Sequence, residues 1–312
     1  MDVGVIGTGT MGKNHVRVYS RIREVKNIYV FDAVKRNTDD LEKYDAIACD
    51  SLDELLQKVD AVSICVPTEH HAVITHEVID KNVHCLIEKP ITFTLEEGEK
   101  LLDAVPRGLI VGVGHIERFN PIVNEIKKVA NHIRYCEIRR HNPASTRITD
   151  ATVVKDLMIH DIDIVFNVLF RGKEHTLFSA GDQDVCSSLV KFNGAIAALS
   201  TSRISSKKIK SIYVEEEEFT VEGDFMLQEV YLYRKPEKYG FKDDRYAQEN
   251  IIEKVLLSKV EPLYVELETF VDCVKHHQAF PITPEQAVNN LRICEEVERG
   301  LQWDTISMKQ LS

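Results

Sequence analysis

Residues 156–163 carry the clearest set of chemically active side chains in the sequence. Asp156, His160 and Asp163 are spaced i, i+4 and i+7, so on an α-helix at about 100° per residue they share one face. A carboxylate one turn from an imidazole can fix the tautomer of the ring and raise its basicity, which prepares a general base near neutral pH. An acidic first turn followed by an ordinary buried histidine would give the same pattern, so these residues alone leave both interpretations open.

The surroundings of these residues predict a largely buried helix with one polar face. Asn167 extends that face, and the rest of the circumference is mostly apolar, with Leu157, Met158, Ile162, Ile164, Val165, Val168 and Leu169. Other elements must therefore enclose this helix and bring a reaction partner to its polar face.

The first residues of the chain predict a dinucleotide-binding unit. A short apolar strand over residues 3–6 leads directly into Gly7-Thr8-Gly9-Thr10-Met11-Gly12 and an amphipathic helix to about residue 22. In this setting the first glycine permits a tight turn, the second lets the backbone approach a pyrophosphate, and the third lets the helix pack on the strand. The N-terminus of the helix supplies amide donors to the phosphates.

Asp32 bears on the choice of dinucleotide. It ends a second strand over residues 28–31, twenty residues beyond Gly12, where a carboxylate accepts hydrogen bonds from the adenosine ribose. This favours NAD over NADP, although the nearby Lys35 and Arg36 soften the preference. An aspartate that merely caps a turn is the alternative.

Alternating strands and helices over the first 113 residues predict a doubly wound parallel sheet. Further strands are expected at residues 46–49, 61–66, 84–87 and 109–113, with helices after the strands. Ligands of such sheets lie at the carboxyl ends of the strands, which places 67–68, 88–90 and 114–115 around one crevice. Lys89 could there steer a substrate hydroxyl, or it could be an ordinary surface lysine.

The second part of the chain predicts a separate α+β domain. Successive strands without intervening helices indicate an antiparallel sheet, and they are expected at residues 135–140, 177–180, 188–192, 195–202, 209–214, 219–221 and 229–233. Helices are expected at 262–277 and 284–300. The expected division is a Rossmann domain over 1–118, a substrate and oligomerisation domain over 119–283, and a C-terminal helix and tail over 284–312 that packs back on the first domain.

Composition narrows the function. The 312 residues carry a net charge of -11, which argues against nucleic acid as the main partner. Seven widely spaced cysteines and the absence of an apolar run of about 20 residues predict a soluble, cytoplasmic, membrane-free protein. No metal is expected, because His70-His71 and His276-His277 lack the spacing of zinc or calcium ligands.

Over nearly its full length the sequence resembles the family of glucose-fructose oxidoreductase and inositol dehydrogenase. The matching motifs are Gly7-x-Gly9-x-x-Gly12, Glu88-Lys89-Pro90, Gly114-x-x-x-Arg118-Phe119-x-Pro121 and Asp156-x-x-x-His160-x-x-Asp163. The resemblance implies a Rossmann domain and a second domain with an open, mostly antiparallel sheet that commonly forms the oligomer interface. It also implies NAD(P)-linked oxidation or reduction at a sugar or cyclitol carbon.

The resemblance also assigns roles to individual residues. His160 would take the hydroxyl proton, Lys89 would bind the same oxygen, and Asp156 would hold the assembly in place. The cofactor residues it implies are Gly7, Thr8, Gly9, Thr10, Met11, Gly12, Asp32, Pro67, Thr68, His71, Glu88 and Lys89; the substrate residues are Lys89, His115, Arg118, Arg147, Asp156 and His160.

Within this family, residues 114–121 and 260–267 are most similar to UDP-N-acetylglucosamine 3-dehydrogenases, which oxidise the 3-hydroxyl of the sugar. Such a substrate brings about two negative charges, for which Arg118 and Arg140 or Arg147 are the candidate partners. A cyclitol or free-sugar dehydrogenase is the alternative within the enzymes, and a non-catalytic NAD-responsive regulatory protein is the alternative of another class. A homodimer or homotetramer through the second-domain sheet is expected.

Overall fold

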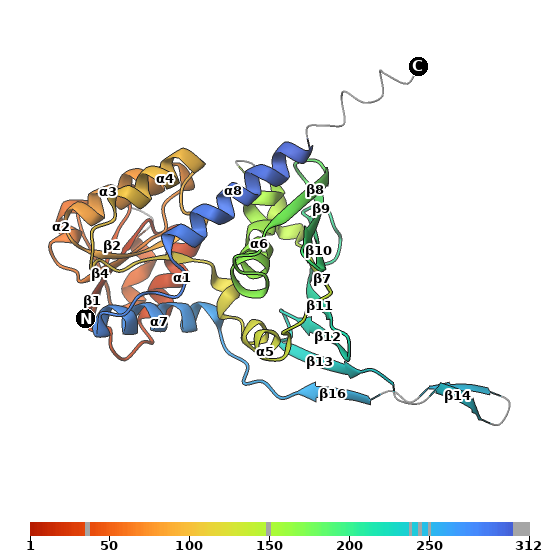
Figure 1. Ribbon diagram of the computed structural model, residues 1–312. Helices are drawn as coiled ribbons and strands as arrows, with labels where there is room; N and C mark the ends of the chain where they lie inside the picture. The colour runs from red at the N-terminus through yellow and green to blue at the C-terminus, as the bar shows by residue number, and fades with distance from the viewer. Residues whose placement is uncertain (35–37, 148–150, 237–238, 243–244, 249–250, 302–312) are drawn as a thin grey trace, which may run out of the picture. The chain divides into compact units, whose positions relative to one another are not determined.

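The computed structural model describes residues 1–34, 38–147, 151–236, 239–242, 245–248 and 251–301 (Figure 1). It divides into two compact units. Met1–Phe119 and Val260–Arg292 form the first, and Asn120–Lys259 with the residues from Ile293 on form the second. Residues 260–283, which the sequence placed in the second domain, therefore lie in the first unit, and the expected C-terminal segment divides after Arg292.

The first unit is built on a six-stranded parallel sheet in the order β3-β2-β1-β4-β5-β6. The strands are β1 (Asp2–Ile6), β2 (Asn27–Phe31), β3 (Ala46–Ala48), β4 (Ala61–Ile64), β5 (His84–Glu88) and β6 (Val111–Gly114). The order reverses between β1 and β4, which is the switch point at which such sheets bind dinucleotides. The predicted Rossmann fold is confirmed.

Helices cover both faces of this sheet. They are α1 (Thr10–Tyr19), η2 (Asp39–Tyr44), α2 (Leu52–Leu56), η3 (Thr68–His70), α3 (His71–Asp80), α4 (Leu95–Ala104), η4 (Ile116–Phe119), α7 (Pro262–His276) and the first part of α8 (Pro284–Leu301). In Figure 1, α1 and α7 lie on one face and α3 and α4 on the other. α7 packs on α1, which explains its place in this unit.

The second unit is built on an eight-stranded sheet in the order β16-β13-β12-β11-β7-β10-β9-β8. The strands are β7 (Tyr135–His141), β8 (His175–Gly181), β9 (Val185–Phe192), β10 (Ala195–Ser202), β11 (Ile209–Glu215), β12 (Phe219–Asp224), β13 (Glu229–Arg234) and β16 (Ile251–Val255). Every neighbouring pair is antiparallel except β7 and β10, which are parallel. The mostly antiparallel sheet agrees with the prediction.

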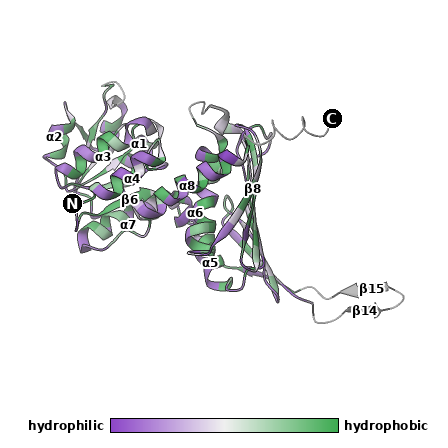
Figure 2. Cartoon of the chain, turned by 45° about the horizontal axis from the view of Figure 1, so that its top comes forward, coloured by the Kyte–Doolittle hydropathy of each residue, from purple (hydrophilic) through white to green (hydrophobic). Residues whose placement is uncertain are grey.

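One face of this second sheet is covered by helical segments (Figure 2). These are α5 (Pro121–Val129), the short η5 (Pro143–Arg147), and a continuous helical stretch made of η6 (Val154–Met158), α6 (Ile159–Ile164) and η7 (Val165–Leu169). Strand alternation buries Cys136, Ile138 and Arg140 on the helix side and leaves Tyr135 and Glu137 on the opposite side. The sheet therefore has one packed and one open face.

Two further elements were not predicted. β14 (Tyr239–Lys242) and β15 (Arg245–Gln248) form a two-stranded sheet, and β16 extends the large sheet beyond β13. The side chains of β16 are mostly exposed, so the strand lacks the apolar–polar alternation by which a half-buried strand is found in a sequence. Among the described residues no helix is both long and apolar enough to cross a membrane. All seven cysteines are free thiols.

Candidate functional site

The glycine-rich loop fits a dinucleotide phosphate. Gly7 adopts a φ of 84°, which favours glycine at the tight turn after β1. A Cβ on Gly12 would lie 1.9 Å from the carbonyl oxygen of Gly7, so only glycine lets α1 pack this closely on the loop. A Cβ on Gly9 would meet nothing within 4 Å, so the loop has open space where a pyrophosphate would approach.

Asp32 is fixed against this loop. Its Oδ2 accepts hydrogen bonds from the backbone nitrogen of Thr8 at 2.7 Å and from Thr8 Oγ1 at 3.1 Å, and Oδ1 accepts one from Val34 N at 2.8 Å. These contacts hold the carboxylate in place at the end of β2, where a ribose would lie. The predicted Lys35 and Arg36 beside it lie outside the described residues.

His71 links the loops that follow β4 and β5. It is buried at the start of α3, where Nδ1 lies 2.8 Å from the carbonyl oxygen of Pro90 and Nε2 lies 2.9 Å from that of Val66. Burial lowers the pKa of His71, although both carbonyl contacts oppose that effect. Pro67 and Thr68 open the intervening η3, so His71 holds together two of the loops that the sequence placed around the crevice.

Glu88 and Lys89 end β5 beside this group. The Glu88 carboxylate is buried, lies 2.9 Å from His15 Nε2 through Oε1, and accepts the backbone N–H of Lys89 at 3.2 Å through Oε2. Lys89 itself is half-buried. Two parts of the cofactor region, α1 and the loop of the predicted lysine, are thus joined through one carboxylate.

The predicted central helix is present but is not a regular α-helix. Its first and last turns, η6 and η7, are π-helical, and the α-helical part α6 lies between them. π-Helical turns occur frequently at functional sites because the wider turn redirects side chains. Asp156 and His160 are half-buried, Asp163 is buried and accepts a hydrogen bond from Asn167 at 3.0 Å, and the remaining positions are mostly apolar and buried.

Asp156 has a partner that the sequence did not reveal. The hydroxyl of the buried Ser145 donates a hydrogen bond to Asp156 Oδ2. Ser145 is in turn held by a backbone hydrogen bond of 3.0 Å to Asn142 O, and Asn142 N bonds to Ser202 O at the end of β10 at 2.8 Å. The carboxylate is therefore connected to the sheet.

The proposed phosphate role of Arg140 is wrong. Its side chain is 1% exposed and points to the packed face of β7, where Nε donates to Asp161 Oδ1 at 2.8 Å. A guanidinium committed to a buried carboxylate cannot reach a bound anion. The side chain of Arg147, the other candidate, lies outside the described residues.

The remaining substrate candidates lie in the first unit. His115 is buried, and its Nε2 accepts a hydrogen bond from Asn290 Nδ2 at 3.2 Å. The half-buried Arg118 donates to Gln286 Oε1 at 2.7 Å and to Pro281 O at 3.3 Å. These contacts give both side chains a packing role, and their contact with substrate stays a prediction.

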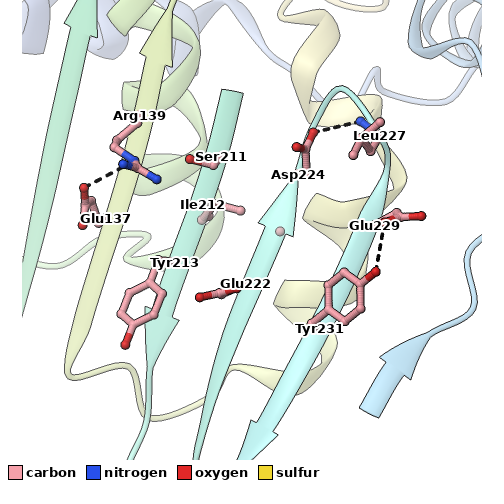
Figure 3. A pocket seen from close by; sticks show the side chains of 11 residues that line it. Glu137, Arg139, Ser211, Ile212, Tyr213, Glu222, Asp224, Leu227, Glu229 and Tyr231 are labelled. Carbon is pink, nitrogen blue, oxygen red and sulfur yellow. Dashed lines mark hydrogen bonds and ion pairs between the residues drawn. The ribbon is translucent and has the colours of Figure 1, made fainter. Parts of the chain in front are cut away.

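One surface hollow is separate from all of these residues. It has a volume of about 440 Å³ and lies on the open face of the second sheet, between side chains of β7, β11, β12 and β13 (Figure 3). Glu137, Arg139, Tyr213, Glu222 and Tyr231 are among its lining residues. It contains none of the predicted catalytic or cofactor groups, so it is not a candidate for the reaction site.

The described residues contain no group of three or more His, Cys, Asp or Glu side chains arranged to hold a metal ion. The cofactor supported by the geometry is instead a dinucleotide, held by the glycine loop and Asp32. Two site residues, His15 and Ser145, were missed. His15 carried a sequence signal, because it lies one turn after the glycine motif on the same helix, whereas Ser145 carried none.

Comparisons with known proteins agree with this geometry. The family described as an oxidoreductase family with an NAD-binding Rossmann fold matches residues 1–115. The UDP-N-acetylglucosamine 3-dehydrogenase of Acidithiobacillus ferrooxidans is 30% identical over 293 residues, which cover 89% of this chain and 90% of that protein. The scyllo-inositol 2-dehydrogenase (NAD(+)) of Bacillus subtilis is 25% identical over 93% of this chain and 90% of that protein.

Solved structures extend the similarity to the whole fold. UDP-N-acetylglucosamine 3-dehydrogenase GnnA from Acidithiobacillus ferrooxidans superposes with a TM-score of 0.85 at 27% identity, over 96% of this chain and 97% of that one. Levoglucosan dehydrogenase in complex with NADH and levoglucosan gives a TM-score of 0.82 at 15% identity, over 96% of both chains. The second likeness concerns the fold alone.

Proposed function

The chain belongs to the oxidoreductase family with an NAD-binding Rossmann fold, and we propose that it oxidises the 3-hydroxyl of UDP-N-acetylglucosamine to a ketone. The observation that supports this choice of substrate is the similarity, over 89% of this chain, to an enzyme named for that reaction. The alternative, oxidation of a cyclitol, has the support of a lower identity of 25%.

The cofactor would be held by residues of the first unit. A Cβ on Gly9 would meet nothing within 4 Å, which leaves space for the pyrophosphate against the loop, and Asp32 would accept hydrogen bonds from the adenosine ribose. Pro67, Thr68 and His71 would line the crevice with Glu88 and Lys89. Bound NAD supplies the hydride acceptor for the reaction.

The chemistry would be carried by three side chains. His160 would accept the proton of the 3-hydroxyl, and Lys89 would donate a hydrogen bond to the same oxygen, which stabilises the developing negative charge. Asp156, held by Ser145, would orient the base or the sugar. Proton removal by a positioned base contributes about 10²–10⁴ in rate.

The charge of the substrate sets a further requirement. A nucleotide-sugar pyrophosphate must meet local cations on a protein whose net charge is -11. Arg118 and Arg147 are the proposed partners, because a guanidinium binds phosphate oxygens through two parallel donors. Arg140 is excluded by its burial.

We further propose that the protein is a cytoplasmic homo-oligomer that pairs through the open face of the second sheet. On that face Phe178 and Leu189 are direct cross-strand neighbours and are 70% and 53% exposed, and Ile196 nearby is 45% exposed. Tyr213 and Tyr231 flank the hollow on the same face. Exposed apolar side chains of this density mark an interaction surface, and a second copy offers the same surface in a two-fold arrangement.

The function is tested by incubating the protein with NAD and UDP-N-acetylglucosamine and following NADH absorbance and the 3-keto product. A parallel assay with 2-oxoglutarate detects turnover in a protein that retains NADH. His160→Ala and Lys89→Ala should each lower the rate by about 10²-fold or more while the NAD dissociation constant stays near wild type. Lys100→Ala, which changes an exposed lysine on α4, is the control.

Inactivity with the nucleotide-sugar alongside rapid oxidation of inositol would assign the chain to the cyclitol branch. Turnover above about a tenth of the wild-type rate in both variants would contradict the acid–base roles. For the oligomer, Leu189→Glu should shift the mass measured by light scattering to that of one chain, because the charge would be buried in the interface.

A further inference from the structure

A buried polar chain runs beneath the carboxyl end of β5. His15 on α1 contacts the Glu88 carboxylate, and one turn further along α1 the hydroxyl of Tyr19 pairs with Ser63 Oγ on β4 at 2.7 Å. The rings of His15 and Tyr19 meet edge to face at 6.3 Å. None of these side chains is needed to cradle phosphate, and the reaction proposed above does not use them.

The contacts of the Glu88 carboxylate favour its ionised form. Burial acts to raise the pKa of Glu88, but the hydrogen bond from His15 and the nearby charges of His15, Lys89 and His71 hold it below its usual value. Glu88 and Gly114 are register partners on β5 and β6, and a Cβ on Gly114 would lie 3.3 Å from Glu88 Oε1. The sheet therefore leaves room for this carboxylate and supplies a donor to keep it charged.

The position of Glu88 in the sheet decides which half of the dinucleotide its charge would act on. Rossmann sheets bind a dinucleotide across two halves, with one nucleoside over each half. Asp32, which would bind the adenosine ribose, follows β2 in the first half, whereas Glu88 ends β5 in the second half. The second half is the one that the nicotinamide nucleoside would occupy.

We propose that the Glu88 carboxylate, held in place by His15, makes the site prefer the oxidised cofactor. The nicotinamide ring of NAD⁺ carries a positive charge that NADH lacks, so a fixed buried negative charge in that half stabilises NAD⁺ relative to NADH. This inference rests on the proposed function only in its choice of cofactor. The consequence is earlier release of NADH after hydride transfer.

The test is the ratio of two dissociation constants, Kd of NAD⁺ over Kd of NADH, measured on the full-length protein. NADH fluorescence gives one constant and its displacement by NAD⁺ gives the other. Glu88→Gln keeps the shape of the side chain and removes its charge, so the ratio should rise on the order of tenfold, as expected for unit charges ~10 Å apart at an effective dielectric of ~20.

His15→Gln provides an independent variant. Without its partner the buried Glu88 is more readily protonated, so the ratio of the two dissociation constants should rise in this variant too. The ratio in the double variant should be only slightly higher than in Glu88→Gln. Asp32→Asn is the matched control, because it removes a carboxylate on the adenosine side. It should weaken the binding of NAD⁺ and of NADH by the same factor and leave the ratio of their dissociation constants unchanged.

A ratio that stays at the wild-type value in Glu88→Gln overturns the inference while the proposed dehydrogenase activity still stands. Binding of neither nucleotide to the wild-type protein overturns the inference together with the cofactor assignment. If Glu88→Gln fails to fold, as judged by its melting curve without nucleotide, the ratio in His15→Gln decides alone.

Discussion

Arg140 Nη2 and Asp161 Oδ1 lie 2.7 Å apart, and each side chain is 1% exposed. The pair joins β7 to α6, next to His160 in the sequence, and the guanidinium carbon also lies 5.4 Å from the ring centroid of Phe225. A buried pair of this kind fixes the position of α6 on the sheet, because removal of either partner leaves a charge without compensation.

Replacement of Arg140 by Leu should therefore lower the free energy of unfolding by about 3–5 kcal/mol, since Asp161 would remain buried without its cation. Urea denaturation followed by circular dichroism measures the change. The double variant Arg140→Met, Asp161→Leu should recover much of the loss. Arg292→Met, which breaks an exposed ion pair with Glu99, is the control and should change the free energy of unfolding by less than about 1 kcal/mol.

Ser145→Ala should lower kcat about tenfold without changing the NAD dissociation constant, because Asp156 would lose the donor that orients it. Ser145→Thr keeps a hydroxyl and should retain most of the rate. Ser179→Ala removes another buried hydroxyl pair in the same unit, with Ser188 at 2.7 Å, and serves as the control. If Ser179→Ala lost as much kcat as Ser145→Ala, Ser145 would act through the stability of the fold and not through Asp156.

The glycine loop yields a pair of contrasting variants. Gly12→Ala should prevent correct packing of α1, since its Cβ would lie 1.9 Å from a backbone oxygen, and the melting temperature should fall in the absence of nucleotide. Gly9→Ala meets no protein atom within 4 Å, so its melting temperature should stay near wild type while NAD binding weakens. Calorimetry and NADH titration separate the two effects. Unaltered NAD affinity in Gly9→Ala would exclude the loop as the phosphate site.

Stability should depend on pH through His71. Burial lowers the pKa of His71 in the folded state below the unfolded value of about 6.5, so below that pH the unfolded chain binds more protons than the folded one. The free energy of unfolding should then fall between pH 7.5 and 5.5, and His71→Gln should reduce that slope. His70→Gln replaces the exposed neighbour and should leave the slope as it is. A steeper slope in His71→Gln would contradict the assignment.

The regular parts of the fold were predictable because they depend on local patterns. Mostly apolar runs such as 61–64 and 85–87 alternate with helices, and that pattern specifies a parallel sheet with two covered faces. The π-helical turns around α6 could not be read in this way, because they depend on how the helix packs rather than on its periodicity. The place of α7 in the first unit is likewise decided by tertiary packing.

The candidate site shows the same division. Lys89, Asp156 and His160 could be proposed from the sequence because each has a reactive side chain and lies in a motif. Ser145, in contrast, is a serine in a short turn eleven residues before its partner. The error on Arg140 was avoidable. Cys136, Ile138 and Arg140 alternate along β7 on the buried face, and that alternation already placed the arginine inside.

The first unit is built from two segments that are far apart in the sequence, so the ribosome synthesises the first segment long before the second. The ring of Phe280 fills the space over Gly112, where a Cβ would lie 2.4 Å from it, and the carbonyl of Ile282 accepts the N–H of Val113 at 3.1 Å. A ribosome that adds about 5–20 residues per second reaches these positions roughly 10–30 s after Phe119. During that interval Gly112 lacks the covering ring and the N–H of Val113 lacks this acceptor, so the edge strand β6 of the nascent chain is incomplete.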